Sequence, residues 1–230
     1  MIMRLSACSS ALVLGLALCC PSLILRAQEN DTTAVRYMLE VVEAEARQPG
    51  LVRYEIHVLL PDSDRVSAVY GTDTHPLELR APKGVFNSPY NGSWSSSGMN
   101  PKFFELMPDM QDDTYATIGL RTSAKLSGVH RAEDPTMVQD PSEPWDDFFT
   151  VNGETTLEVS THTGGSWFVL RTAANGAPVD GRVMLAQITT PGSVSGALNL
   201  QVFPAEPEIE QFRVRFEFDG VGRVEGRMVE

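Results

Sequence analysis

Asp73 and His75 stand two positions apart in the segment RVSAVYGTDTHPLEL, residues 65–79, between two apolar runs. A carboxylate and an imidazole at this spacing can share one metal ion. A third ligand would have to come from another segment, because the chain has no His-x-His or His-x-x-x-His pattern. The alternative is a turn between two strands, in which Asp73 bonds nearby backbone N–H groups and Pro76 sets the start of the next strand. We predict the turn.

Clusters of acidic residues in the predicted loops offer a second metal chemistry. Calcium takes about six to eight oxygen ligands from carboxylates and carbonyls, and loops between strands supply both. The acidic spacing does not match an EF-hand loop, which needs a central glycine and a terminal glutamate. We predict Asp109, Asp112 and Asp113 as the ligands if calcium binds. The alternative is that these carboxylates are solvated groups on an acidic surface.

Aromatic residues in a Gly- and Ser-rich loop indicate a different ligand. Residues 84–98 read GVFNSPYNGSWSSSG, an irregular loop that carries Phe86, Tyr90 and Trp94. An exposed aromatic ring presents an apolar face on which a sugar ring can stack. We predict Tyr90 and Trp94 as ligand-binding residues for an extracellular glycan or matrix component. The alternative is that each ring packs into the rim of the fold.

The first segment, residues 1–27, predicts a secretory signal peptide. Arg4 supplies a positive charge, an apolar run follows, and Ala27 is the small residue of a cleavage site. A transmembrane anchor is the alternative, but the apolar run is interrupted by Pro21 and is short for crossing a bilayer. We therefore predict a secreted protein, extracellular or periplasmic, in which residues 28–230 form one domain.

All three cysteines, Cys8, Cys19 and Cys20, lie inside this leader. A lipoprotein modified at Cys19 or Cys20 is a further alternative, although Leu18 stands where a small residue is expected. Cleavage after Ala27 leaves a chain without a disulfide, a thiolate-bound metal or a thiol nucleophile. A hydrophobic core must then hold the exported chain together, and a composition of 42% hydrophobic residues is sufficient for one.

The charge and the missing motifs exclude several classes of function. A formal net charge of −12, from 18 basic and 30 acidic residues, argues against binding to nucleic acid or to anionic lipid. The chain contains no Gly-x-Ser-x-Gly elbow and no dinucleotide or Walker glycine pattern. With 30 acidic residues, some pair of carboxyl groups will lie at glycosidase spacing by accident, so the acids give no support to hydrolysis.

The candidate metal-binding and ligand-binding residues lie between short runs of strand-forming residues, which are separated by turn residues. The pattern predicts an all-β fold, an antiparallel β-sandwich of roughly ten strands with long surface loops. Trp167, inside an apolar run, is predicted to lie in the core. A turn of helix is predicted within residues 100–110, with Asn100 as its cap, and residues 127–144 are predicted as a long loop. The predicted strands lie within residues 34–46, 51–60, 65–71, 76–80, 113–120, 145–151, 154–160, 165–172, 182–190, 195–203, 210–218 and 220–229.

Three segments resemble a group of secreted proteins and modules found mostly in marine bacteria and some algae. They are DRVSAVYGTDTHPLEL, NPKFFELMPDMQDDTYATIGL and GSWFVLRT followed by VDGRVMLAQITTPGSVSGALNLQVF, within residues 65–203. Asp113-Thr114-Tyr115 stands where the shared pattern has Asp-Ser-aromatic. The resemblance implies export and a β-rich fold. It implies no activity and carries over no site residue.

The sequence therefore predicts a secreted, non-catalytic extracellular module that binds a ligand or serves a structural role. A glycan or matrix component is the expected partner, with assistance from calcium as an added hypothesis. The alternative is an extracellular hydrolase that acts on a polymer. A binding module should carry exposed aromatic rings on a flat or grooved face, whereas an enzyme should carry convergent polar groups in a pocket.

Overall fold

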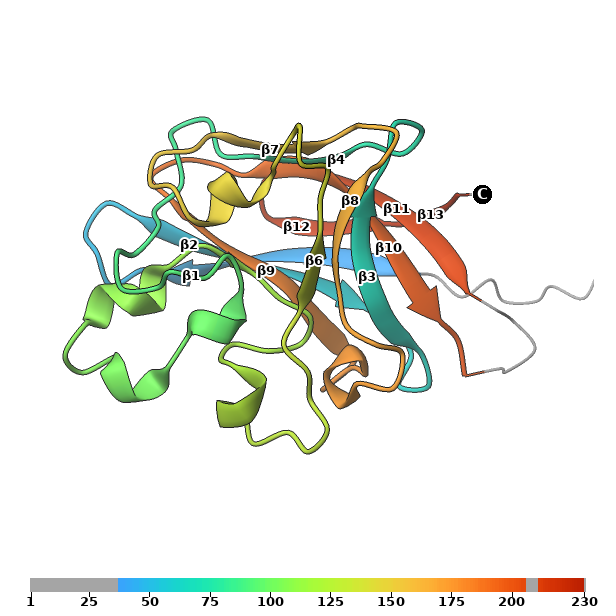
Figure 1. The fold of residues 1–230 in the computed structure, drawn as a ribbon, viewed down its shortest axis with the longest axis horizontal. Helices are drawn as coiled ribbons and strands as arrows, with labels where there is room; N and C mark the ends of the chain where they lie inside the picture. The colour runs from blue at the N-terminus through green and yellow to red at the C-terminus, as the bar shows by residue number, and fades with distance from the viewer. Residues whose placement is uncertain (1–36, 206–210, 230) are drawn as a thin grey trace, which may run out of the picture. The chain divides into compact units, whose positions relative to one another are not determined.

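The computed structural model describes residues 37–205 and 211–229, all of which belong to one compact unit, Val35–Glu230 (Figure 1). The predicted signal peptide, residues 1–27, and its cleavage site lie outside the described residues, so secretion stays a prediction.

Sheet A has five antiparallel strands in the order β12-β1-β2-β9-β5. Alternating residues of β1 and β2, such as Leu39, Val41 and Ile56, point into the core. The strands are β1 Met38–Glu45, β2 Val52–Leu59, β5 Tyr115–Ala116, β9 Arg182–Thr190 and β12 Gly222–Glu225.

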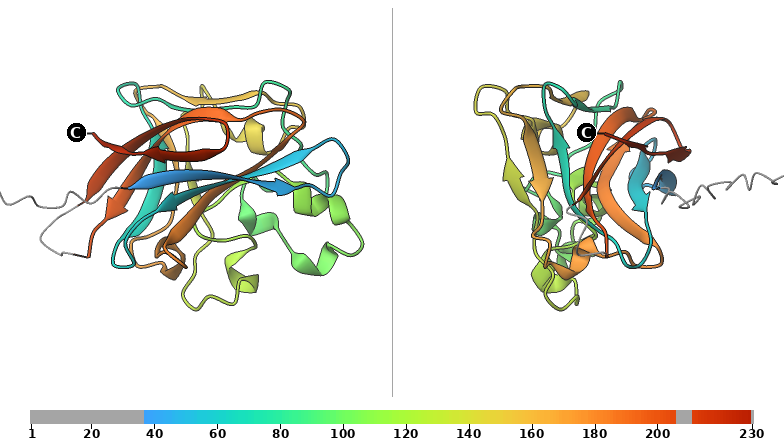
Figure 2. Two further views of the ribbon diagram at one scale, coloured as in Figure 1. Left: turned by 180° about the vertical axis from the view of Figure 1, so that it is seen from behind. Right: turned by 90° about the vertical axis from the view of Figure 1, so that its right-hand side faces the viewer.

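Sheet B is larger, with the strand order β13-β11-β10-β3-β8-β6 and with β4 and β7 joined beside β10. Its strands are β3 Arg65–Gly71, β4 Leu77–Arg80, β6 Thr136–Val138, β7 Thr156–Val159, β8 Gly165–Phe168, β10 Ser195–Phe203, β11 Phe212–Asp219 and β13 Arg227–Met228. Buried side chains from both sheets belong to one hydrophobic cluster, and the two sheets lie face to face (Figure 2). The predicted all-β sandwich is confirmed.

The last predicted strand divides between the two sheets. β12 pairs with β1 of sheet A, and β13 pairs with β11 of sheet B. The change of sheet occurs at Gly226, whose N–H donates to the Tyr37 carbonyl at 2.9 Å. A Cβ at this position would lie 2.5 Å from Val214 Cγ1 and 2.6 Å from the Phe216 ring, so a larger residue would have to displace these core side chains.

The helical elements of the described residues are six short 3-10 turns. They are η1 Ser96–Gly98, η2 Pro101–Phe103, η3 Pro108–Asp112, η4 Ala124–Leu126, η5 Asp146–Phe149 and η6 Ala174–Gly176. The predicted turn after Asn100 is confirmed, because the Asn100 side chain accepts a hydrogen bond from the Lys102 N–H at 3.1 Å. The predicted loop at residues 127–144 includes the three-residue strand β6, which pairs with β8.

The strand predicted at residues 145–151 is wrong, because this segment forms η5. Phe148 and Phe149 are consecutive and both are 1% exposed, with their rings edge to face at 5.3 Å. A strand would send two consecutive side chains to opposite faces, whereas a tight helical turn allows both to enter the core.

Sheets A and B differ in how their outer faces are covered. The segment that carries η1, η2 and η3 packs on the outer face of sheet A, where Met99, Met110, Tyr115 and Met184 form a second buried cluster. Sheet B has no second cluster of this kind in the described part of the chain. Its outer face is therefore the more open of the two.

Trp167 is a central side chain of the core, and we expect its removal to be among the most destabilising substitutions. The ring is 1% exposed, lies 5.6 Å from Trp145 and 6.0 Å from Phe149, and its Nε1–H donates to the Thr117 carbonyl at 3.2 Å. Trp167→Ala should lower the free energy of unfolding by about 3–5 kcal/mol. Chemical denaturation measures this loss. Leu106→Ala, at a 79% exposed residue, is the control and should change it by no more than about 0.5 kcal/mol.

Candidate functional site

Two neighbouring rows of side chains cross the outer face of sheet B, and together they define a candidate binding site. Each row consists of residues paired directly across adjacent strands β11, β10, β3, β8 and β6. The first row is Arg213, Gln201, Ala68, Phe168 and Thr136, and the second is Arg215, Asn199, Tyr70, Ser166 and Val138.

Ala68 makes a hollow in this face, which we call the sheet B hollow. Its methyl group stands between the longer side chains of Gln201 and Phe168 in the first row. Tyr70 stands two residues further along β3, on the same face. The resulting cavity has a volume of about 370 Å³. Most of its lining belongs to strands β3, β8, β10 and β11 and is held in place by the sheet, and the rest belongs to the turn between β3 and β4.

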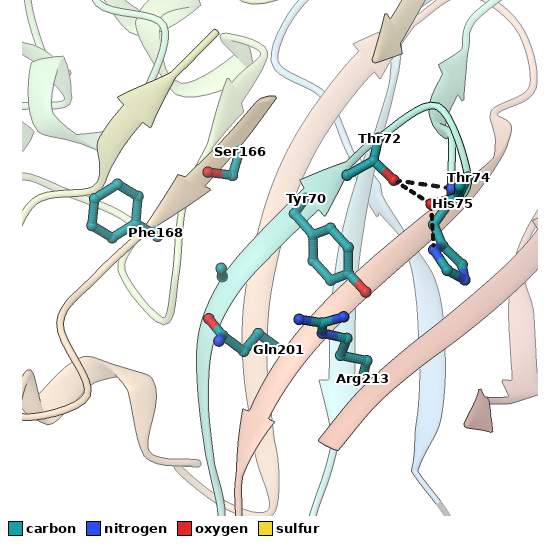
Figure 3. Close-up of a pocket in the computed structure, with 9 residues that line it drawn as sticks. Tyr70, Thr72, Thr74, His75, Ser166, Phe168, Gln201 and Arg213 are labelled. Carbon is teal, nitrogen blue, oxygen red and sulfur yellow. Dashed lines mark hydrogen bonds between the residues drawn. The ribbon is translucent and has the colours of Figure 1, made fainter. Parts of the chain in front are cut away.

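The hollow combines aromatic rings with polar groups (Figure 3). Tyr70 and Phe168 come from neighbouring strands, and the Tyr70 hydroxyl points toward the Arg213 guanidinium. That hydroxyl is buried and has no hydrogen-bond partner among the described residues. Burial raises the pKa of Tyr70 above its ordinary value, against the opposing charges of Arg213 and Arg215, so the hydroxyl keeps its proton.

Arg213 and Arg215 stand on the same face of β11 but differ in their contacts. Arg215 donates to the Pro76 carbonyl at 2.7 Å and to Asn199 Oδ1 at 3.0 Å, and it pairs with Glu217 at 3.0 Å. Within the described ranges, Arg213 makes no ion pair and no side-chain hydrogen bond. The N–H groups of Arg215 are therefore used in contacts within the protein, while those of Arg213 are available to bind a ligand.

The turn predicted around Asp73 and His75 closes one end of the hollow. The Thr72 N–H donates to the His75 carbonyl at 3.0 Å, and the His75 N–H donates to Thr72 Oγ1 at 3.1 Å. Asn199 Nδ2 donates to the His75 carbonyl at 2.7 Å and ties the turn to β10. The segment between β3 and β4 is therefore the predicted turn, and His75 lines the hollow.

Asp73 does not face the hollow as a partner of His75. Its Oδ2 lies 3.1 Å from Nδ1 of His162, in the turn before β8, and both side chains are exposed. The His162 hydrogen bond holds the pKa of Asp73 below its ordinary value. His75 instead contacts Thr74 Oγ1 at 3.2 Å. Asp73 and His75 are therefore split between two different contacts.

Tyr90 and Trp94, predicted as ligand-binding residues, occupy different environments. Tyr90 is 52% exposed, whereas Trp94 is half-buried and packs edge to face on Trp145 at 5.6 Å. The Trp94 carbonyl also accepts a hydrogen bond from the Ala116 N–H, which attaches this loop to β5. Neither ring lines the sheet B hollow. Their role in binding stays a prediction.

The predicted calcium ligands lie at η3, but two of them already accept several N–H donors. Asp112 is fully buried and accepts the backbone N–H groups of Arg47 at 2.9 Å and Gln48 at 2.8 Å. Asp113 is 1% exposed, and its two oxygens accept from the Ser88 N–H and from Asn91 Nδ2, both at 2.6 Å.

These contacts make Asp112 and Asp113 clamps that hold neighbouring loops. Both carboxylates are buried and each already accepts two N–H donors, so neither presents its oxygens to the solvent. Asp109, on the first turn of η3, does not complete a cluster: residues 37–205 and 211–229 contain no group of three or more His, Cys, Asp or Glu that could hold a metal ion. Calcium binding stays a prediction that lacks a preformed site in this part of the chain.

Sequence reasoning missed the residues of the sheet B hollow, although a signal was present. Alternation in RVSAVYG places Ala68 and Tyr70 opposite the core residue Val69, and alternation in GSWF places Ser166 and Phe168 opposite Trp167. The pattern does not show that β3 and β8, which lie nearly a hundred positions apart in the chain, pair with each other.

Comparisons with known protein families, curated proteins and solved structures found no match for this chain. The resemblance to secreted marine proteins therefore stays an expectation. No helix in the described part of the chain is long and apolar enough to cross a membrane.

Asp113 should make the stability of the protein depend on pH. Burial raises the pKa of Asp113 from 3.8 to about 7, although hydrogen bonds from Asn91 and Ser88 act in the opposite direction. A carboxyl group with a raised folded-state pKa stabilises most below its unfolded pKa, and that contribution disappears as the pH rises through the folded value. Relative to Asp113→Asn, the wild-type free energy of unfolding should fall by at most about 4 kcal/mol between about pH 4 and about pH 8.

Denaturant titrations across this pH range measure the difference, with Glu105→Gln as the control at an exposed acid of the same segment. A difference between wild type and Asp113→Asn that is the same at every pH would contradict the prediction.

Proposed function

We propose that the protein is a non-catalytic glycan-binding module of the extracellular space, with the sheet B hollow as its ligand site. The observation that carries the proposal is the placement of Tyr70 and Phe168 beside the Ala68 gap, on neighbouring strands of a rigid sheet. The proposal takes residues 1–27 to be a leader that directs export.

The chemistry of the hollow matches the two kinds of surface that a sugar ring presents. The C–H faces of a sugar ring pack on aromatic side chains such as Tyr70 and Phe168. The hydroxyl groups at its edge need both donors and acceptors, and Gln201, Ser166 and the unpartnered Tyr70 hydroxyl can supply them. Arg213 adds a charged donor for a hydroxyl or an acidic substituent.

The lining of the hollow favours binding over hydrolysis. Glycoside hydrolysis commonly uses two carboxyl groups on either side of the scissile bond. The described residues that line the hollow include no Asp and no Glu, and its ionisable side chains are those of Tyr70, His75 and Arg213. An extracellular hydrolase, the alternative from the sequence, would need its carboxyl groups elsewhere on the chain.

Substitutions in the hollow should weaken glycan binding while leaving the fold intact. We expect a panel of soluble polysaccharides to include at least one that retards the protein in affinity electrophoresis. Tyr70→Ala and Phe168→Ala should each weaken that binding at least about tenfold, which corresponds to about 1.4 kcal/mol, because each removes one stacking face.

Tyr90→Ala is the matched control, because it removes an exposed ring outside the hollow. Its affinity should equal that of the wild type. Loss of binding in Tyr90→Ala, with unchanged binding in Tyr70→Ala and Phe168→Ala, would move the site to the loop at residues 84–98. Absence of binding to every polysaccharide on the panel would count against the proposed function.

A further inference from the structure

A second cavity lies on the outer face of sheet A and is independent of the proposed glycan site. It has a volume of about 520 Å³, within the range of small-molecule sites. β2 and β9 form its floor, and its walls come from the segment at residues 119–129 and the turn before β9. We propose that this cavity, the sheet A cavity, binds a carboxylate attached to an aliphatic group.

Two neighbouring groups of charged side chains lie on the face of sheet A at the floor of the sheet A cavity. In the first, Glu40 is 6% exposed and pairs with Arg223 at 2.7 Å and with Arg182 at 3.2 Å. Glu40 stands directly opposite His57 across β1 and β2. Arg182, which is 41% exposed, also lines the cavity and keeps N–H groups that Glu40 does not use.

The second group is centred on Glu55, which is 7% exposed. Both Glu55 oxygens accept from the Arg121 guanidinium, and Glu55 Oε2 lies 3.1 Å from His57 Nε2. Burial acts to raise the pKa of Glu55, but the contacts with Arg121 and His57 together outweigh it and hold that pKa well below its ordinary value, so the group is a carboxylate. Arg121 is 55% exposed and lines the cavity together with His57.

This arrangement leaves cationic donors facing the cavity. The two groups contain three guanidinium groups and two carboxylates, and the exposed rim residue Asp180 supplies a third carboxylate, so the opposite charges around the cavity are equal in number. His57 is 4% exposed and its Nδ1 has no partner among the described residues. A buried ionic network is costly unless its members are fully paired, and an incoming carboxylate would accept from the unused N–H groups of Arg121 and Arg182.

The rim of the sheet A cavity is aliphatic and exposed. Leu126, Val129 and Val179 are 39%, 42% and 69% exposed, and they are three of the exposed large hydrophobic residues of the described chain. Leu120 and Met184 continue this apolar surface into the cavity wall. An exposed apolar cluster beside charged donors is typical of a binding site rather than of ordinary surface.

A ligand with one carboxylate and an aliphatic body fits both features. One carboxylate can accept from the unused N–H groups of Arg121 and Arg182, while the rim residue Asp180 opposes a more highly charged anion. Two sources offer this chemistry: a free aliphatic acid, and the C-terminal carboxylate of a protein chain that ends in aliphatic residues.

Calorimetric titration with butyrate, hexanoate and octanoate tests the proposal directly. We expect the acids to bind, each methylene that reaches the rim to strengthen binding about fourfold, and hexanol to bind at least about tenfold more weakly than hexanoate. N-acetyl-Ala-Val and its C-terminal amide distinguish the two sources. If N-acetyl-Ala-Val binds more tightly than hexanoate and its C-terminal amide does not bind, the ligand is the C-terminus of a protein chain.

Val179→Asp should weaken hexanoate binding at least about tenfold, because it places a second negative charge on the rim. Val221→Asp is the matched control at a residue that is 54% exposed and outside the cavity, and it should bind as the wild type does.

Arg182→Gln should reduce the preference for hexanoate over hexanol, while Arg223 still pairs with Glu40. Equal binding of acid and alcohol, equal loss in both Asp variants, or no binding of any acid or peptide would overturn the proposal.

Discussion

The burial of Trp167 in the hydrophobic cluster shared by the two sheets is the main constraint on the strands that surround it. All three cysteines lie within residues 1–27, so residues 28–230 have no covalent cross-link and apolar contacts must hold the sheets together. Trp167 anchors β8 from the inside, against Trp145 and Phe149. Because side chains alternate along a strand, the same placement turns Ser166 and Phe168 outward. The core thus determines which residues line the sheet B hollow.

The local pattern predicted much of the fold, because alternation and turn chemistry are local properties. Runs such as residues 51–60 and 195–203 became long strands, and Asn100 caps the turn that it was expected to cap. The failures have physical causes. Phe148 and Phe149 enter the core from a 3-10 turn, and the strand at residues 136–138 depends on its pairing with β8, which its own three residues do not encode.

The candidate sites were harder to predict, because a site is a set of contacts between distant segments. Asp112 and Asp113 lie in an acidic segment of the kind that binds calcium. In the structure, their oxygens accept N–H groups from residues at least 20 positions away, which the local sequence does not indicate. Trp94 is an aromatic residue in a Gly- and Ser-rich loop, which suggests a sugar-binding ring. In the structure its ring packs on Trp145, a contact that the local sequence does not indicate. The sheet B hollow exists because Ala68 is small beside Phe168, and strand register alone makes these two residues neighbours.

A glycan that binds on the outer face of sheet B would change the surroundings of the backbone amides in that face, and an NMR titration detects such a change. ¹H–¹⁵N spectra of the protein would be recorded as oligosaccharides are added. The proposal predicts that the largest shifts fall on the amides of Ala68, Tyr70, Ser166 and Phe168, across two paired strands. Shifts confined to residues 84–98, or no shifts with any oligosaccharide, would contradict it.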